Sequence, residues 1–197
     1  MKWYKYDIRE MSLADYQKWY GLMNQSKRAR VDCFHFADDR KRTVAGEMLA
    51  RKAIAQWCDV PAESIAFELT EAGKPYAKDM AVEFNISHCG DMVICAVDNK
   101  PVGVDIERIR PIHLKIAKRI CTEEELTYLF GHRPTEEDFV YTTDYEKLVR
   151  FFELWTDKEA LCKQKGVGIS ELYSALEKRT VQTENIIDGE YMICIAV

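Results

Sequence analysis

The sequence predicts an α/β (α+β) fold built from two similar halves, and three observations support this prediction. Apolar residues make up 47% of the 197 residues, which is ample for a packed core and argues against global disorder. Alternating segments typical of strands are interspersed with long stretches of helical spacing. The run Val93–Val97 also resembles Met192–Ala196, although five apolar residues can coincide by chance. We therefore expect halves spanning residues 1–100 and 101–197.

The first half is predicted to contain two helices and four strands. The opening residues indicate a strand, after which Ser12 caps a helix that runs toward Met23. A longer amphipathic helix spans residues 37–58 and ends before Pro61. The other predicted elements are strands at 65–69, 82–86 and 92–97, with a turn at 72–75.

The second half is predicted to begin with a strand at 102–107 and to continue with helices. Thr122 and Glu125 match a capping box, in which each side chain binds a free backbone N–H at the start of a helix. The predicted helices are 112–120, 122–130 and 146–165, with a polar loop at 131–145 and short strands at the end of the chain.

Three carboxylates stand where packing alone would not place them. Asp105 and Glu107 lie two residues apart in a strand, so both side chains leave the same face. Glu159 lies on a predicted helix, within the apolar stripe formed by Leu148, Phe152, Trp155 and Cys162. An ionised carboxylate on a core-facing stripe is costly unless it is paired or bound to a metal. The three acids therefore predict a site for a hard divalent cation.

Charge is distributed unevenly along the chain. The net charge is −5, which argues against general nucleic-acid binding. Residues 24–52, however, contain eight Lys or Arg and four acids, a local charge of +4, so the remainder carries −9. This segment is either a solvated helix face or a pocket for a multiply phosphorylated ligand.

The sequence predicts a soluble protein of the cytoplasm. Its seven cysteines are scattered, and their spacing suggests neither a disulfide framework nor a zinc site. The N-terminus lacks the apolar region of a signal peptide, and no apolar run approaches the length of a membrane span.

Two further groups of residues indicate phosphate chemistry. Ser87 and His88 end a predicted strand, where a hydroxyl and an imidazole can reach a phosphate, although a single His at a strand end is more often structural. Lys163 follows Glu159 by four residues. The pair is either an ordinary helical ion pair or a phosphate-binding Lys beside the metal.

Four segments in this order resemble the signature of the 4′-phosphopantetheinyl transferases. The resemblance is to the larger, surfactin-synthetase-activating type rather than to the short holo-carrier-protein-synthase type. It covers residues 73–168 by motif and nearly the whole chain when the N-terminal helices are included. The four segments are Gly73–Pro75, Phe84–His88, Val102–Glu107 and Phe151–Lys163 with Gly166 and Gly168.

The resemblance implies two α/β halves related by a pseudo-twofold axis and a role for each matching position. The implied Mg²⁺ ligands are Asp105, Glu107 and Glu159. Glu159 is also the implied general base, and Lys163 and His88 are implied to contact the phosphates of coenzyme A and to be catalytic. The residues implied around the rest of coenzyme A are Lys27, Arg30, Arg42 and Thr43 at the 3′-phosphate, Gly73, Lys74 and Pro75 beside the adenosine, and Ser87.

Two positions depart from the family pattern. Cys89 stands where a serine commonly follows the His, and Arg30 stands where a lysine is frequent. Neither departure removes an essential group, but a hydroxyl contact at position 89 is in doubt.

The resemblance implies an Mg²⁺-dependent transfer of 4′-phosphopantetheine from coenzyme A to a serine of an apo acyl or peptidyl carrier protein, releasing 3′,5′-ADP. The attacking hydroxyl would come from the partner, since the sequence shows no nucleophile elbow or Cys–His pair. We expect a monomer that binds neither nucleic acid nor membranes. The alternatives are a non-catalytic module that binds coenzyme A or docks carrier proteins, and a metal-dependent phosphohydrolase or nuclease.

Overall fold

Each half of the chain builds a three-stranded antiparallel sheet, and the strand order is the same in both. The computed structural model describes residues 1–71, 73–167 and 182–197. The first strand of each half lies at one edge, and the last strand of each half lies in the middle. The orders are β1 (Lys2–Asp7), β5 (Met92–Asp98), β4 (Glu83–Cys89) and β6 (Gly103–Arg108), β10 (Tyr191–Ala196), β9 (Thr183–Asp188).

This arrangement confirms the predicted α/β class, and it explains the similarity between Val93–Val97 and Met192–Ala196. These runs form β5 and β10, the buried central strands of the two sheets. A central strand that is buried on both faces is apolar throughout, so equivalent places favour similar sequences. The pseudo-twofold axis and the division at residue 100 stay predictions.

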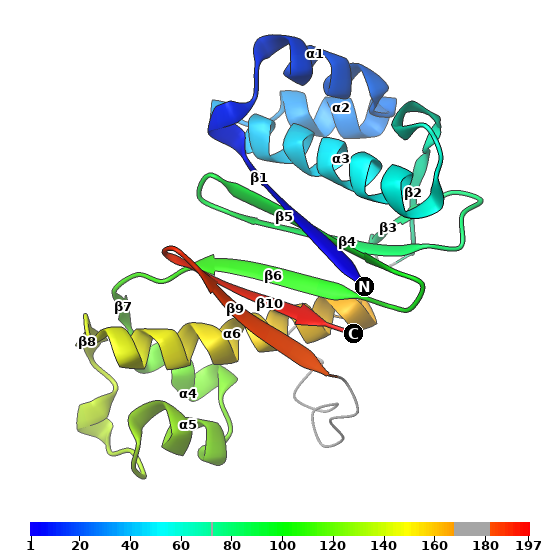
Figure 1. Cartoon of the computed structure of the whole chain (residues 1–197). Coiled ribbons are helices and arrows are strands. Elements are labelled where there is room, and N and C mark those ends of the chain that lie inside the picture. Colours follow the sequence, from blue (N-terminus) through cyan, green and yellow to red (C-terminus); the bar gives the residue numbers. More distant parts are fainter. Residues whose placement is uncertain (72, 168–181) are drawn as a thin grey trace.

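The two sheets pack against each other, and one long helix covers the outer face of each (Figure 1). In β5, Val93, Cys95 and Val97 belong to the core that includes α3 (Ala37–Cys58). The alternate residues Ile94 and Ala96 instead contact Val104 and Ile106 of β6 and Ile193 and Ile195 of β10. The second helix, α6 (Tyr145–Lys165), lies against β6 and β10. The period-two alternation of the strands therefore builds three apolar layers from two sheets.

The termini of the helices follow from local sequence. Ser12 caps α1 (Leu13–Leu22) by accepting from the N–H of Asp15, as predicted. The predicted capping box of Thr122 and Glu125 is present at α5 (Glu123–Phe130). Asp144 caps α6 through the N–H groups of Glu146 and Lys147. The other short elements are α2 (Gln25–Asp32), β2 (Phe67–Leu69), β3 (Pro75–Ala77) and 3₁₀ turns at Ile8–Glu10 and Ala62–Ser64.

The helix predicted at 112–120 is wrong in its first half. Ile112–His113 forms the short strand β7, which pairs with β8 (Tyr141–Thr142), and a 3₁₀ turn then leads into α4 (Ala117–Ile120). The predicted loop at 131–145 contains β8 and a 3₁₀ turn at Glu136–Asp138. The apolar spacing of Leu114, Ala117 and Ile120 suits a helix, but pairing with a segment almost thirty residues away overrides it at the start.

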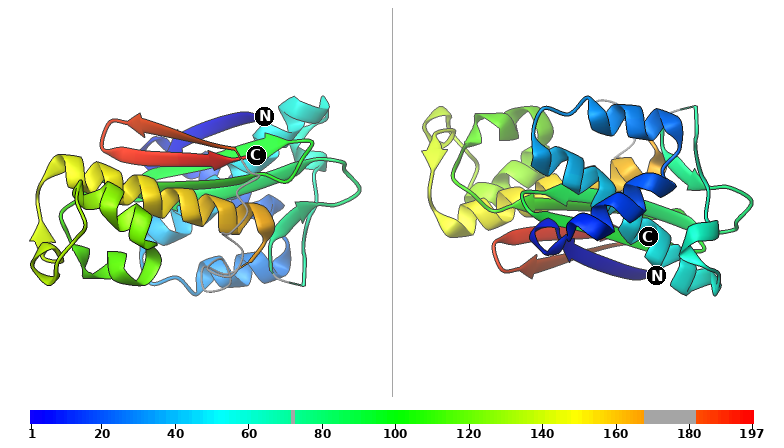
Figure 2. Two further views of the ribbon diagram at one scale, coloured as in Figure 1. Left: turned by 90° about the horizontal axis from the view of Figure 1, so that it is seen from below. Right: turned by 90° about the horizontal axis from the view of Figure 1, so that it is seen from above.

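The two ends of the chain lie near each other, at the side where the sheets meet (Figures 1 and 2). Away from the termini, beside the hairpin that joins β9 and β10, the Lys5 ammonium of β1 pairs with Asp188, and this ion pair connects the outer strands of the two halves. Among the described residues, every helix is too short or too polar to cross a bilayer.

Side chains connect the two sheets where β4 runs beside β6. The Asn85 side chain is 7% exposed, and its Oδ1 accepts from the backbone N–H of Val104 at 3.0 Å. The side-chain oxygen of Asn85 thus accepts from the N–H of Val104, which in a continuous sheet would bond to a backbone carbonyl of the neighbouring strand. This bond sets the position of β6 relative to β4, the two strands whose side chains meet in the candidate site.

We expect Asn85→Ala to lower the free energy of unfolding by about 1–3 kcal/mol, because the buried N–H of Val104 would lose its acceptor. A urea titration measures this change. Asn185→Ala, on the exposed face of β9, is the matched control and should change stability by less than about 0.5 kcal/mol. Equal losses in the two variants would contradict a special role for Asn85.

Candidate active site

Asp105 is the residue on which three elements converge. Its side chain on β6 is 4% exposed. Oδ1 accepts from Ser87 Oγ of β4 at 2.8 Å and from Lys163 Nζ of α6 at 2.6 Å, and Lys163 also donates to Ser87 Oγ at 2.9 Å. Ser87, Asp105 and Lys163 were all predicted to lie at the site, and the structure brings them into direct contact.

The second oxygen of Asp105 has no such partner. Oδ2 is buried and has no hydrogen bond within the part of the chain that the structure describes. A buried anionic oxygen without a donor is costly, so Oδ2 is an acceptor ready for a cation or a donor from a ligand.

Glu107 and Glu159 lie beside Asp105 and respond to its charge. Both are half-buried. Burial raises the pKa of each side chain, and the Asp105 charge raises it further. Lys163 lowers the pKa of both carboxyls, but less strongly. The three predicted acids therefore form one electrostatic cluster.

The cluster suits a hard cation chemically. Carboxylate oxygens are the ligands that Mg²⁺ prefers, and a divalent cation would offset the repulsion that raises these pKa values. Among the described residues, no three His, Cys, Asp or Glu side chains form a closed ligand set. The fit therefore rests on the free Oδ2 of Asp105 and on the two neighbouring carboxyls.

The helix α6 presents its functional side chains along one line. Trp155, Glu159 and Lys163 are spaced by four residues and share a face. The predicted apolar stripe is confirmed at Leu148, Phe152 and Cys162, which are buried, whereas Trp155 and Glu159 are half-buried at the site.

The sequence analysis missed a buried charge on the same helix. Lys158 is 2% exposed, and its ammonium lies 2.9 Å from Glu125 Oε1. Because Glu125 also closes the capping box of α5, this pair fixes α5 against α6 next to Glu159. Charged residues at consecutive positions look solvated in a sequence, so only the tertiary structure shows this pairing.

An apolar pocket of about 220 Å³ opens beside Glu107, and the sequence analysis did not foresee it. The Arg110 guanidinium lies 5.7 Å from the centre of the Phe152 ring at its wall. The pocket thus joins an acid of the cluster to an aromatic surface. Its lining residues are Glu107, Arg110, Ile112, His113, Ile116, Phe151, Phe152 and Trp155.

The basic residues predicted at the 3′-phosphate differ in how they are held. Lys27 Nζ lies 2.6 Å from Glu47 Oε2, and Glu47, 2% exposed, also pairs with Arg51 at 2.7 Å. Arg30 is exposed on α2. Thr43 Oγ1 donates to the carbonyl of Asp39 at 2.9 Å.

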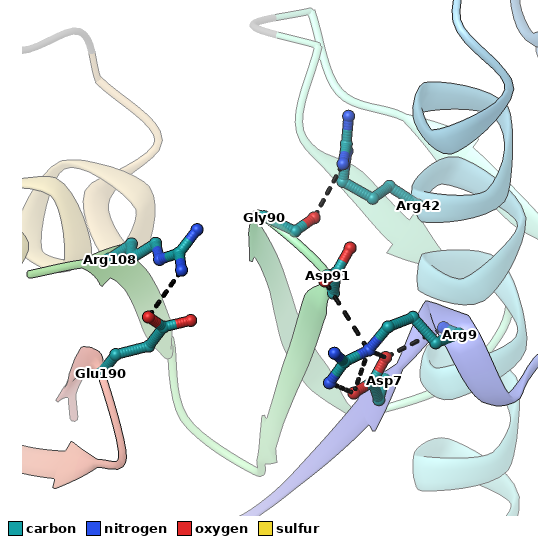
Figure 3. A network of polar contacts seen from close by, with 7 residues as sticks. All are labelled: Asp7, Arg9, Arg42, Gly90, Asp91, Arg108 and Glu190. Atoms are coloured by element: carbon teal, nitrogen blue, oxygen red, sulfur yellow. Dashed lines mark hydrogen bonds and ion pairs between the residues drawn. The ribbon is translucent and has the colours of Figure 1, made fainter. Parts of the chain in front are cut away.

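Arg42 anchors the turn that follows His88 (Figure 3). Its guanidinium donates to the carbonyl of Gly90 at 2.7 Å and to Asp39 at 2.6 Å. On the other side of Gly90, the Tyr191 hydroxyl stands 2.8 Å from where a Cβ would lie, and the φ of Gly90 is +56°. Both features favour glycine at position 90.

Around this turn, three further ion pairs tie down the neighbouring strand ends (Figure 3). Arg9 binds Asp7 and reaches Asp91, while Arg108 binds Glu190 at 2.7 Å. The turn that follows His88 and Cys89 is thus held by Arg9 and Arg42 of the first half, and Arg108–Glu190 closes a neighbouring turn of the second half.

His88 and Cys89 flank the cluster. Although solvent reaches much of His88, surrounding atoms desolvate its ring and lower its pKa, and the nearby charge of Arg42 adds to this. A neutral imidazole is therefore favoured at neutral pH. The Cys89 thiol donates to Glu107 Oε2 at 3.5 Å, in the place where the family commonly has a serine.

The turn predicted beside the adenosine lies near the end of α6. Gly73 has a φ of +81°, and Pro75 begins β3. Lys74 Nζ lies 3.5 Å from the carbonyl of Gln164 and 3.7 Å from Glu83. Gly166 ends α6 with a φ of +69°, whereas Gly168 lies outside the described residues.

Comparison with known proteins gives the family. The model for the 4′-phosphopantetheinyl transferase N-terminal region matches residues 10–100, and the model for the 4′-phosphopantetheinyl transferase superfamily matches residues 101–193. The chain belongs to the 4′-phosphopantetheinyl transferase superfamily.

Its relatives include members from several bacteria. The 4′-phosphopantetheinyl transferase Sfp of Bacillus subtilis is 36% identical over 166 residues, covering 84% of this chain and 70% of Sfp. The transferase psf-1 of Bacillus pumilus is 41% identical over 154 residues, or 78% and 62% of the two chains. HetI of a Nostoc species is 30% identical over 157 residues, or 76% and 62%. The predicted resemblance to the larger type of transferase is confirmed.

The structure brings the residues predicted around the metal together, but it holds Lys27, predicted at the 3′-phosphate, apart from them. Ser87, Asp105, Glu107, Glu159 and Lys163 form the acid cluster. Lys27 is bound within its own half. The individual roles of all these residues stay predictions.

We expect Glu159→Gln to stabilise the metal-free protein at about pH 8. Because the pKa of Glu159 is raised in the fold, its ionised form costs stability above that pKa, and the cost disappears as pH falls to the ordinary range of a carboxyl. Thermal melts should therefore show a gain over the wild type that shrinks to nothing by about pH 4.

Glu137→Gln, at an exposed position, should leave the melting temperature unchanged at both pH values. A Glu159→Gln variant that melts below the wild type at about pH 8 would show that the carboxylate is stabilising and would contradict the pKa direction.

Proposed function

We propose that this protein transfers the 4′-phosphopantetheine group of coenzyme A to a serine of an apo acyl or peptidyl carrier protein and releases 3′,5′-ADP. Membership of the transferase superfamily supports the reaction class. The observation on which the site assignment rests is Asp105, whose Oδ1 is held by Ser87 and Lys163 and whose buried Oδ2 is free.

Asp105, Glu107 and Glu159 are the residues that would hold Mg²⁺. When bound, the cation supplies positive charge to the pyrophosphate of coenzyme A and to the leaving group. The free Oδ2 and the mutual rise of the acid pKa values support this assignment.

The protein's own residues position the reactants and move one proton. The serine oxygen of the carrier forms a bond to the phosphorus that bears pantetheine, and the bond from that phosphorus to 3′,5′-ADP breaks. Glu159 accepts the serine proton, a role that suits a carboxyl whose pKa is raised by burial. Lys163 places its ammonium where it can donate to a phosphate oxygen.

The apolar pocket beside Glu107 is proposed to receive the pantetheine arm. Pantetheine extends from the phosphate that reacts, so its site must begin at the acid cluster. The pocket is lined by the aromatic side chains of Phe151, Phe152 and Trp155, and it also includes Glu107 of the acid cluster.

An exposed basic segment beside the pocket is proposed to dock the carrier protein. Between Arg108 and Arg119 the chain has five cations and no acid, and all five are exposed. Carrier proteins are typically acidic, so this charge favours encounter and orientation. Because a single chain supplies every group of the cluster, we propose that the protein acts as a monomer. We also propose that it acts in the cytoplasm.

The deciding experiment is mass spectrometry of a panel of apo carrier proteins incubated with coenzyme A and Mg²⁺. We expect the wild type to add one phosphopantetheine to a serine. Asp105→Asn keeps an acceptor for Ser87 but removes the charge, and it should slow transfer by at least about a hundredfold while the fold is retained.

Asp59→Asn, at the exposed C-terminal end of α3, serves as a control for loss of charge and should remain active. Wild-type rates for Asp105→Asn would refute the metal assignment. Failure of the wild type with every carrier would favour the non-catalytic binding module.

We expect Arg30→Ala to weaken the binding of coenzyme A by about tenfold more than the binding of dephospho-coenzyme A. The reason is that a charged hydrogen bond to the 3′-phosphate would be lost. Lys27→Ala should have a smaller effect, since the charge of Lys27 is already offset by its ion pair with the buried Glu47. Calorimetric titration of both ligands measures the differences. Lys100→Ala, exposed and distant in sequence, is the control, and equal losses on both ligands would exclude a 3′-phosphate role for Arg30.

A further inference from the structure

The helix bearing Glu159 and Lys163 touches the acid-bearing strand at a glycine. A Cβ at Gly103 would lie 1.9 Å from the carbonyl oxygen of Ala160 and 2.5 Å from the backbone N of Gln164. Ala160 directly follows Glu159, and Gln164 directly follows Lys163. The backbone of β6 at Gly103 therefore touches the backbone of α6 at the residues that directly follow Glu159 and Lys163.

Space, rather than backbone conformation, requires the glycine. Gly103 is absent from the described residues that have positive φ, unlike Gly73, Gly90 or Gly166. An alanine could adopt its strand conformation, so the only obstacle to a methyl group is α6 itself.

Most side chains around this contact are small. Gly103 pairs with Ala196 of β10, and Ala196 belongs to a core cluster with Cys194 and with Ala160, Leu161 and Cys162 of α6. The Gln164 side chain also donates to the carbonyl of Pro101 at 3.1 Å, just before β6. Small side chains and this bond hold the last turns of α6 flush against the strand.

We propose that Gly103 is a positioning residue that sets the distance between α6 and β6, and thereby the place of Glu159 and Lys163 relative to Asp105. The inference rests on the proposed function. Contacts of a Cβ closer than 3.0 Å are essentially never seen, so a methyl group would push the helix and strand apart by about 1 Å. Misplacement by about 1 Å can cost about a hundredfold in rate.

The displacement would act unequally across the site. Ser87 and Asp105 lie on β4 and β6, so their 2.8 Å bond should persist when α6 moves, although Lys163 of α6 donates to both side chains. Glu159 and Lys163 lie on the displaced element, and the short side chain of Glu159 has less reach than the four-carbon stem of Lys163. The cation site should therefore weaken, while the basic residues of α2 and α3 keep their places.

The test compares Gly103→Ala with Gly21→Ala, which has open space around its Cβ. Binding of Mn²⁺ to the metal-free full chain is followed by electron paramagnetic resonance, and steady-state transfer is measured with coenzyme A and a carrier. We expect Gly103→Ala to lose about tenfold in Mn²⁺ affinity and about a hundredfold in kcat, with the KM for coenzyme A within about twofold of wild type. Gly21→Ala should match the wild type in all three.

Gln164→Ala provides the test if Gly103→Ala does not fold. It removes the bond to Pro101 without a clash and should weaken Mn²⁺ binding in the same direction by about threefold. Wild-type Mn²⁺ affinity and kcat in folded Gly103→Ala, or in Gln164→Ala where the first does not fold, would overturn the inference.

Asp105→Asn separates this failure from failure of the proposed function. If Asp105→Asn loses Mn²⁺ binding but Gly103→Ala does not, only the positioning role falls. If Asp105→Asn binds Mn²⁺ like the wild type, the acids are not the cation site, and both proposals fall.

Discussion

One buried carboxylate joins the elements on which this molecule's chemistry depends. Asp105 Oδ1 accepts from Ser87 of the first sheet and from Lys163 of the second half's long helix. Breaking such a buried, charge-assisted contact is costly, so the two halves cannot separate at this point without losing stability. The same residue keeps Oδ2 free. Oδ1 of Asp105 therefore stabilises the contact between the two halves, and Oδ2 remains available to bind a ligand.

The acids around Asp105 reduce the stability of the ligand-free protein. Burial and mutual repulsion raise the pKa values of Glu107 and Glu159, which means that their ionised forms are disfavoured in the fold. The apolar cores are built from other residues and do not need these two carboxylates. Side chains that destabilise a fold yet converge on one place are typical of a functional site.

Local signals in the sequence were sufficient for most of the elements, with α2, β7 and β8 among the exceptions, but not for the contacts between elements. The bounds of α3 at Ala37–Cys58 were predicted because a helical period and a breaker at Pro61 are both local. The acids of β6 were predicted to share a face from a two-residue alternation, and the cost of a carboxylate on an apolar stripe predicted that Glu159 joins them in a cation site. The family resemblance added the role of each acid. The β7–β8 pair, the Lys158–Glu125 bond and the apolar pocket all join distant segments, and no local pattern reports them.

The net charge of residues 24–52 also overestimates how many of their Lys and Arg side chains are available to bind a ligand. The local charge of +4 in residues 24–52 suggested a phosphate pocket, but Arg51 is buried against Glu47 and three backbone carbonyls. Lys27 shares Glu47, and Arg42 is bound to Gly90 and Asp39. These cations order the first half, and their field still attracts an anion. Under the proposed function, direct contact with the 3′-phosphate is expected first of Arg30, because Arg30 is exposed.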